Sequence, residues 1–301
     1  MRNIGEITKT NGVSTSVEMV EEPTIPAEPY WGMAAKRYKN MGAPLRPSTQ
    51  DIGFLEETVA AYAALHSKPC HAVLLGVTPG IAAMQWPASF SLLGIDCSYE
   101  MVKVLWPGNA PRKRCAVNGN WLSLPKRPSS CDVVIGDGSM NCMRHGEQQR
   151  AFAKSVCTAL KPGGIFILRC FTQPEPQERA DQVFEDALRG AAPNFNAFRL
   201  RLLSALQPST AQGIATKNVY REWAERRDRD SSLVSRAGWS ANDLEIIEGY
   251  RNTGTVFTFP TLAECRETLS ECFQEISVSF GTYDGAERCP RLVLKPRRSG
   301  G

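Results

Sequence analysis

Short apolar runs alternate with stretches of helical spacing through the first half of the chain. The apolar runs have the length of buried strands and lie at residues 72–75, 91–95, 114–117, 132–135 and 165–170. Between them lie a short helical segment after Gly80 and longer ones at 99–105 and 148–160, and a helix at 49–65 precedes them. Strands joined by helices in this way predict a doubly wound α/β fold with a parallel sheet.

The second half of the chain has a different pattern. A helical region at 178–206 is interrupted near Pro193. Before that region, the sequence Lys161-Pro162-Gly163-Gly164 is a helix stop that ends the helix at 148–160. Apolar residues within that region have helical spacing and predict packing against the sheet: Phe195, Phe198, Leu202, Leu203 and Leu206. Capping boxes predict two further helix starts, at Ser240 with Asp243 and at Thr261 with Glu264.

Two strand-like runs close the sequence, at 275–280 and 291–294, with Gly281, Asp284 and Gly285 between them. They predict an antiparallel carboxyl-terminal hairpin. Together with the five earlier strands they make a mostly parallel seven-stranded sheet. We expect residues 1–29, which are polar and contain three prolines, to be a disordered or lid segment. Residues 30–301 then form a single domain, in which 172–273 is a mainly helical insert that caps the substrate site.

Composition narrows the class of protein. The chain has a 42% hydrophobic share and a net charge of +4, which suit an ordinary globular protein without the basic stripe of a nucleic-acid binder. Ten scattered cysteines without a CxxC pair predict free thiols in a reducing compartment, and with only three histidines we expect no metal site. No apolar run approaches the length of a membrane span. These features predict a cytoplasmic protein.

The first two strands each end in residues suited to a nucleotide-like ligand. Val73-Leu74-Leu75-Gly76-Val77-Thr78-Pro79-Gly80 runs from a strand through a tight turn into a helix, and its glycines let the backbone approach a ligand closely. A purely structural turn would look similar. Asp96 ends the next strand, where a carboxylate accepts ribose hydroxyls. Asp96 is also placed to cap the following helix, although Ser98 suits that role better.

The third and fourth strands end in two further candidate sites. After the third, the Asn120 amide is suited to the edge of an adenine ring and Trp121 to its face, or the two simply form an anchored turn. After the fourth, Gly136-Asp137-Gly138 exposes backbone groups at a strand end, with an ordinary Asp-Gly turn as the alternative.

In order and spacing, these motifs resemble those of class I S-adenosylmethionine (SAM)-dependent methyltransferases. That family carries a Gly-rich loop, an acidic strand end, a Gly-Asp stretch and a Leu-Lys-Pro-Gly-Gly turn, which this chain has at 160–164. The resemblance covers residues 30–171, and the closing hairpin is similar to the family's last two strands. It implies a Rossmann-like methyltransferase fold and SAM as cofactor.

The resemblance also implies roles for particular residues. Gly76, Thr78 and Gly80 would line the methionine and ribose side, and Asp96, followed by Cys97, would hold the ribose. Asn120 and Trp121 would frame the adenine, and Asp137 with Gly138 would lie by the methionine amino group or the methyl donor. Tyr38 and Arg46 would reach the methionine carboxylate.

The chain departs from the family pattern at three positions. Leu74 stands where an acidic residue often precedes the first glycine, Thr78 replaces the middle glycine, and Asn120 replaces the usual Asp. These changes suggest a divergent branch with a shifted cofactor pose.

Methyl transfer needs alignment of an acceptor and, for some acceptors, a general base. His145, in the loop after the fourth strand, is the candidate base beside Asp137, or else a solvated loop histidine. The insert favours a small-molecule acceptor over a polymer, and Tyr220, Trp223, Tyr250 and Arg251 are candidates to line its pocket. Two alternatives remain: cyclisation of SAM itself, which releases methylthioadenosine, and SAM binding without catalysis. The acceptor's identity and the oligomeric state do not follow from the sequence.

Overall fold

The computed structural model describes residues 29–66, 68–109, 113–124, 130–191 and 194–297. Seven strands form one sheet in the order β3-β2-β1-β4-β5-β9-β8, with the first five parallel and β9 antiparallel to both its neighbours. This confirms the predicted fold class. The strands are β1 Cys70–Leu75, β2 Phe90–Asp96, β3 Arg114–Asn118, β4 Cys131–Asp137, β5 Leu160–Arg169, β8 Phe273–Ser279 and β9 Arg291–Pro296.

Strand order follows the hydrophobic pattern. β1 and β4, at the centre, are buried along almost their whole length, whereas the edge strands β3 and β8 are half-exposed. Successive residues of a strand face opposite sides, so Leu75 packs on one layer of helices and Leu74 on the other. The strand order reverses between β1 and β4, and open α/β sheets bind ligands in the crevice at such a point.

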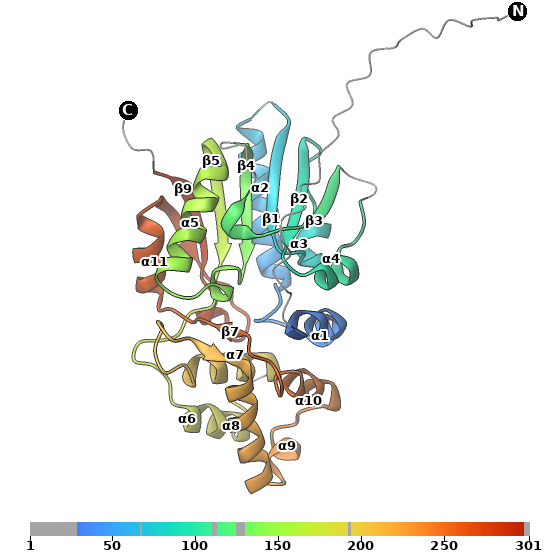
Figure 1. Cartoon of the computed structure of the whole chain (residues 1–301), viewed down its shortest axis with the longest axis vertical. Helices are drawn as coiled ribbons and strands as arrows, with labels where there is room; N and C mark the ends of the chain where they lie inside the picture. Colours follow the sequence, from blue (N-terminus) through green and yellow to red (C-terminus); the bar gives the residue numbers. More distant parts are fainter. Residues whose placement is uncertain (1–28, 67, 110–112, 125–129, 192–193, 298–301) are drawn as a thin grey trace, which may run out of the picture.

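Helices cover both faces of the sheet (Figure 1). Apolar side chains of α2 (Thr49–Ala64) and α3 (Pro79–Ala83) fill one face, and those of α5 (Glu147–Ala159) and α11 (Leu262–Ser270) fill the other. The helix α4 (Tyr99–Leu105) follows β2. Both predicted capping boxes are present, and a third at Ser48 and Asp51 starts α2.

The helix before residues 161–164 ends where expected, but these residues belong to a strand and not to a turn. The helix α5 ends at Ala159, and β5 begins at once with Leu160, which pairs with Cys131 of β4. A shift of register between Cys131 and Val133 accommodates the extra residues, so the Pro-Gly-Gly sequence lies inside the start of the strand.

The helical insert has a hydrophobic core of its own. It contains α6 (Ala180–Leu188), α7 (Phe195–Ala205), α8 (Thr216–Arg229), α9 (Leu233–Arg236) and α10 (Ala241–Glu248), with a small sheet of β6 (Ile214–Ala215) and β7 (Val256–Phe257). Phe198 packs on Trp239 with ring centroids 4.4 Å apart, and Trp223 is fully buried. The α7 residues therefore pack within the insert and not against the sheet as expected, because α8 and α10 supply the apolar partners.

The insert lies beyond the carboxyl ends of the parallel strands (Figure 1). Between the two lies α1 (Pro29–Arg37), which packs on α4 of the sheet layer and on α10 of the insert. The predicted segment at 1–29 stays a prediction, since residues 1–28 fall outside the described ranges. The predicted cap at 172–273 also stays a prediction, and α11, which lies within those bounds, packs on α5 and β8 of the sheet layers. Over the described ranges, no helix has both the length and the apolar character that crossing a bilayer requires.

Candidate active site

The turn after β1 brings the backbone next to the end of β2. Gly76 has a φ of +102°, a conformation that side chains with a Cβ rarely adopt, and its N–H donates to the Ile95 carbonyl at 2.7 Å. A Cβ on Gly76 would lie 3.8 Å from both Asp96 Oδ2 and the Trp121 ring. Gly76, Asp96 and Trp121 therefore meet at one point, as their motifs predict.

Asp96 is a buried carboxylate with one oxygen to spare. Its Oδ1 accepts the Ser98 N–H at 2.8 Å, while Oδ2 has no hydrogen-bond partner among the described residues. Burial raises the pKa of Asp96 to about 6, against the opposing effect of the Ser98 bond. Ser98, and not Asp96, caps α4 through the Met101 N–H. The capping alternative is thus excluded for Asp96.

Asn120 and Trp121 combine an anchored turn with ligand-facing groups. Trp121 Nε1 donates to the Ile95 carbonyl at 2.6 Å, which fixes the indole beside Gly76. Asn120 Oδ1 accepts the Leu122 N–H at 2.9 Å and begins a short 3₁₀ helix, η2 (Trp121–Ser123). Only the amide nitrogen of Asn120 is left for an adenine edge.

The remaining residues of the first loop have mixed placements. Thr78 precedes α3 and makes no side-chain cap. Gly80 lies within α3, where a Cβ would contact Ile52 of α2 at 3.5 Å, so this residue faces the neighbouring helix α2. Cys97 is half-buried, and burial, followed by the charge of Asp96, raises the pKa of its thiol to about 11.

Cys142 is a site residue that the sequence analysis missed. It ends the short helix η3 (Met140–Cys142), and its thiol is within hydrogen-bond reach of the Gly138 carbonyl at 3.6 Å. Burial raises its pKa, and the proximity of Cys97, Asp96 and Asp137 adds to that rise. Cys142 thus lies just after β4, near the end of β2. It could not be identified from the sequence, because a single cysteine belongs to no motif with a recognisable spacing.

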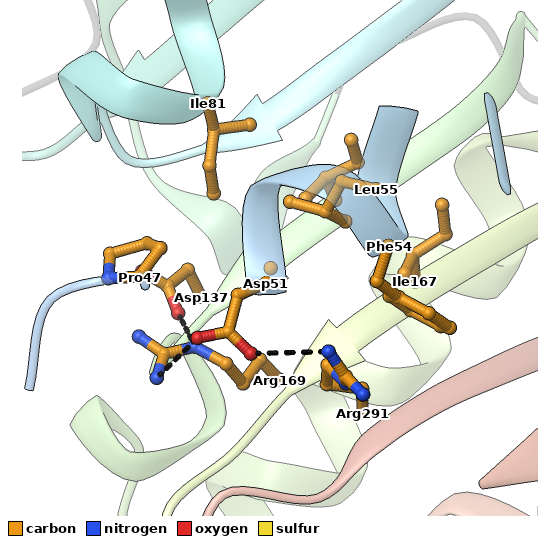
Figure 2. A pocket seen from close by; sticks show the side chains of 11 residues that line it. Pro47, Asp51, Phe54, Leu55, Ile81, Asp137, Ile167, Arg169 and Arg291 are labelled. Carbon is orange, nitrogen blue, oxygen red and sulfur yellow. Dashed lines mark hydrogen bonds and ion pairs between the residues drawn. The ribbon is translucent and has the colours of Figure 1, made fainter. Parts of the chain in front are cut away.

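Asp137 belongs to a buried ion network at the ends of β4 and β5 (Figure 2). Its Oδ1 accepts Arg169 Nε at 2.6 Å, and Arg169 also lies 3.8 Å from Asp51 Oδ2 of α2. Asp51 Oδ1 in turn is 3.6 Å from Arg291 Nη1 of β9. Burial raises the pKa of Asp137, while the charge of Arg169 opposes that rise.

The network encloses a small cavity lined by residues such as Pro47, Ile81 and Ile167. The sequence analysis missed Arg169, Asp51 and Arg291. One sequence signal could have found this network. Arg169 ends a strand that is otherwise apolar, and a buried arginine in that position needs an acidic partner nearby.

Two predicted residues, Tyr38 and Arg46, lie against each other between α1 and α2. Tyr38 lies in the 3₁₀ turn after α1, and the Arg46 guanidinium carbon is 5.3 Å from the centre of its ring. Burial raises the pKa of Tyr38, Asp137 raises it further, and its hydroxyl is buried without a partner. The buried Ser139 hydroxyl, beside Gly138, also lacks a partner. Gly138 has a φ of +65°, and a Cβ there would lie 2.7 Å from the Phe171 ring.

His145 lies in the loop before α5. Its Nδ1 is 3.0 Å from Gln149 Oε1, and Gln149 donates to the Met140 carbonyl at 3.2 Å. No described contact joins His145 to Asp96 or Asp137. Its role as a base stays a prediction.

The strand-end residues fit an adenosyl sulfonium. Asp96 offers an unused carboxylate oxygen beside the positive-φ turn of Gly76, and Tyr38 and Ser139 present buried hydroxyls without partners near Asp137. Such unsatisfied groups are rare in protein interiors unless a ligand completes them. Within the described ranges, no group of three or more histidine, cysteine or acidic side chains is placed to hold a metal ion.

Comparisons with known proteins agree with this geometry. Residues 73–168 match the family model of a methyltransferase domain. The CcbJ methyltransferase from Streptomyces caelestis has a similar fold, with a TM-score of 0.50 and 14% identity over 89% of this chain and 98% of that one. A protein from Rhodobacter sphaeroides, named as a candidate zinc-dependent alcohol dehydrogenase, has a TM-score of 0.56 and 12% identity over 89% and 97%. At such identities the likeness concerns the fold alone, and no curated protein matches the sequence.

The sheet order and the strand-end site define a Rossmann-like protein of the methyltransferase type. The match of residues 73–168 to a methyltransferase domain agrees with the class I SAM-dependent methyltransferase motifs of the sequence.

Proposed function

We propose that the protein transfers the methyl group of SAM directly to a small-molecule acceptor bound between the strand ends and the helical insert. The observation that carries the proposal is the free Oδ2 of Asp96, which lies at the end of β2 beside Gly76 and Trp121. A bound SAM supplies a methyl group on a positively charged sulfur. The protein's own residues then position the two reactants and exclude water.

Each strand end has a distinct task in this proposal. Asp96 accepts the ribose hydroxyls, while the Asn120 amide nitrogen and the Trp121 ring frame the adenine. Thr78 and Cys97 border this half of the site, whereas Gly80 packs against Ile52 of α2.

The methionine end lies toward β4. The Arg46 guanidinium suits the methionine carboxylate, and Asp137 beside Gly138 suits the ammonium group. Arg169 holds the Asp137 carboxylate in place at 2.6 Å. His145 is the base for an acceptor that must lose a proton.

Cyclisation of SAM by its own amino group is the second candidate. The departure at Thr78 and Pro79 from the usual glycine pattern favours it, because a changed loop shifts the pose of the sulfonium. Asp137 argues for methyl transfer, because a carboxylate beside the ammonium keeps that group protonated and therefore not nucleophilic.

The purified protein is incubated with SAM, first alone and then with a library of small-molecule acceptors, and the released nucleoside is identified by mass spectrometry. S-adenosylhomocysteine formed only with an acceptor supports the proposal. Methylthioadenosine released without an acceptor supports cyclisation. Binding of SAM without either product would contradict both.

A further inference from the structure

A second cavity lies between α1 and the helical insert. α1 contributes Tyr30, Met33 and Arg37, α7 contributes Arg199, and Gly249 and Tyr250 follow α10. The cavity encloses about 270 Å³, including the part open to solvent. Its free interior is about the size of one water molecule, which suits the carboxylate end of a ligand and not a whole molecule.

Two cationic side chains line this cavity without an acidic partner. Arg199 is only 2% exposed, and its Nε is buried without a hydrogen bond. Arg37 also has a buried nitrogen, Nη1, that lacks a partner. Among the described residues, neither guanidinium forms an ion pair or a hydrogen bond, and the cavity lining contains no carboxylate.

Other buried arginines in the molecule are compensated. Within the described ranges, Arg169, Arg199 and Arg291 are the arginines classed as buried. Arg169 pairs with Asp137, and Arg291 with Asp51. Burying a charge without a partner is costly, so proteins normally pair it or reserve it for a ligand. Arg169 Nη2 and Arg291 Nε are also buried without a hydrogen bond, so Arg199 differs from these two arginines in its lack of an ion pair.

Neighbouring groups within the chain do not supply the missing charge. Glu248, at the end of α10, pairs with Arg227 and Arg251. The carboxyl end of α10 offers partial negative charge, but none of its carbonyls accepts a bond from Arg37. A Cβ at Gly249 would lie 2.7 Å from Arg37 Nη1, so the absence of a side chain there leaves room for the guanidinium at the cavity.

We infer that this cavity binds the acceptor through a carboxylate group that Arg37 and Arg199 hold together. Paired guanidinium groups favour planar carboxylates through charge-assisted hydrogen bonds. The inference rests on the proposed function, because it names the substrate class for that site.

The rest of the lining defines the body and the direction of the ligand. Tyr30, Tyr250 and Met33 form an aromatic and aliphatic wall, and the Arg199 guanidinium carbon lies 5.8 Å from the Tyr250 ring centre. Burial raises the pKa of Tyr30, which therefore stays a neutral donor. The Tyr30 ring lies 5.7 Å from that of Phe257, and the next residue, Thr258, donates its backbone N–H to the Asn141 carbonyl at 2.9 Å, just after β4. A carboxylate held at the arginines directs the opposite end of the molecule toward the cofactor site.

The test uses the full chain saturated with S-adenosylhomocysteine. Benzoate, phenylacetate, 4-hydroxybenzoate and hexanoate are titrated calorimetrically, each beside its neutral amide and beside phenyl phosphate. We expect at least one carboxylate to bind roughly tenfold or more tightly than its amide, because the amide loses the charge-assisted bonds. Arg199→Met and Arg37→Met should each remove that discrimination, and Arg199→Lys should keep part of it.

Each negative outcome is distinct. Equal binding of acids and amides, no binding of any carboxylate, or tighter binding of phenyl phosphate than of every carboxylate would overturn the inference. Unchanged affinity for S-adenosylhomocysteine in the two Met variants shows that they fold. Failure of the proposed function would appear differently, as no affinity of the wild-type chain for S-adenosylhomocysteine or no methylated product.

Discussion

Two arginine sites on either side of α1 differ in how their charge is balanced. At the ends of β4 and β5, Arg169 contacts Asp137 at 2.6 Å and lies near Asp51, which also pairs with Arg291. Under α1, Arg37 and Arg199 share a cavity with no acid. The first set contains two cations and two anions, whereas the second carries an uncompensated positive charge.

The difference in charge balance indicates that the first arginine site supports the fold and that the second is suited to binding a ligand. A buried network with balanced charge fixes the geometry of the strand ends, although Asp51 Oδ1, Arg169 Nη2 and Arg291 Nε remain without a hydrogen-bond partner. A buried cation without a partner lowers stability until an anion arrives. The same residue type therefore supports the fold in one place and, as we propose, recognises the acceptor in the other.

The largest expected effect comes from replacing one arginine by methionine at each site, in two separate variants. Arg169→Met leaves Asp137 buried without its cation, so we expect the free energy of unfolding to fall by about 3–5 kcal/mol. Arg199→Met removes an unpaired charge, so we expect it to stay within about 1 kcal/mol of wild type or to rise. Urea denaturation followed by circular dichroism measures both. A loss for Arg199→Met as large as that for Arg169→Met would show that Arg199 is paired after all.

The double variant Asp137→Asn with Arg169→Met sharpens this result. Removing both charges should recover part of the lost stability, because no ion then remains unpaired in that pair. If the double variant is no more stable than Arg169→Met, the pairing does not explain the loss.

The next effect concerns pH and the cofactor end of the site. Burial holds the pKa of the free Asp96 at about 6, and ribose hydroxyl donors favour its charged form. Binding should therefore lower this pKa, so SAM affinity should rise as pH increases through 6 and fall up to about tenfold per unit below it. Calorimetry between pH 5 and 8 measures this. Asp96→Asn should have a flat profile over that range, and an equally flat wild-type profile would contradict the assignment.

The smallest expected effect comes from adding one methyl group. Gly249→Ala would crowd Arg37 Nη1, which is the mobile end of a long side chain. We expect stability to change by less than about 1 kcal/mol, while carboxylate affinity falls a few-fold as Arg37 moves. Gly53→Ala in α2 is the matched control, because a Cβ there has no neighbour within 4 Å. A loss of carboxylate affinity in both variants would point to a non-specific cause.

The sheet was predictable because its central strands are buried on both faces and so stand out as apolar runs. Gly76, Asp96 and Asp137 follow three of these runs directly, and parallel strands bring their carboxyl ends to the same edge. Local sequence therefore predicted that Gly76 and Asp96 lie together, while their role in holding a cofactor stays a prediction. The capping boxes at Ser240 and Thr261 were predictable for the same reason, since each involves residues three apart.

Tertiary pairings were not predictable in this way. Arg169 and Asp51 are joined only because β5 and the start of α2 lie side by side, and Arg199 of α7 and Arg37 of α1 line one cavity although they are far apart in the sequence. Helical spacing in α7 identified a buried face but not its partner, so packing against the sheet was expected where the insert's own helices supply it. His145 remains a candidate base on its position alone.

The central claim is that the strand ends hold SAM through Asp96, and titration of SAM into wild-type, Asp96→Ala and Asp284→Ala chains tests it most directly. Asp284 is an exposed acid in the hairpin turn and serves as the control. We expect Asp284→Ala to bind as wild type does, and Asp96→Ala to lose about 100-fold or more in affinity while keeping its circular dichroism spectrum. Affinity of Asp96→Ala within twofold of wild type, or no binding by the wild-type chain, would contradict the claim.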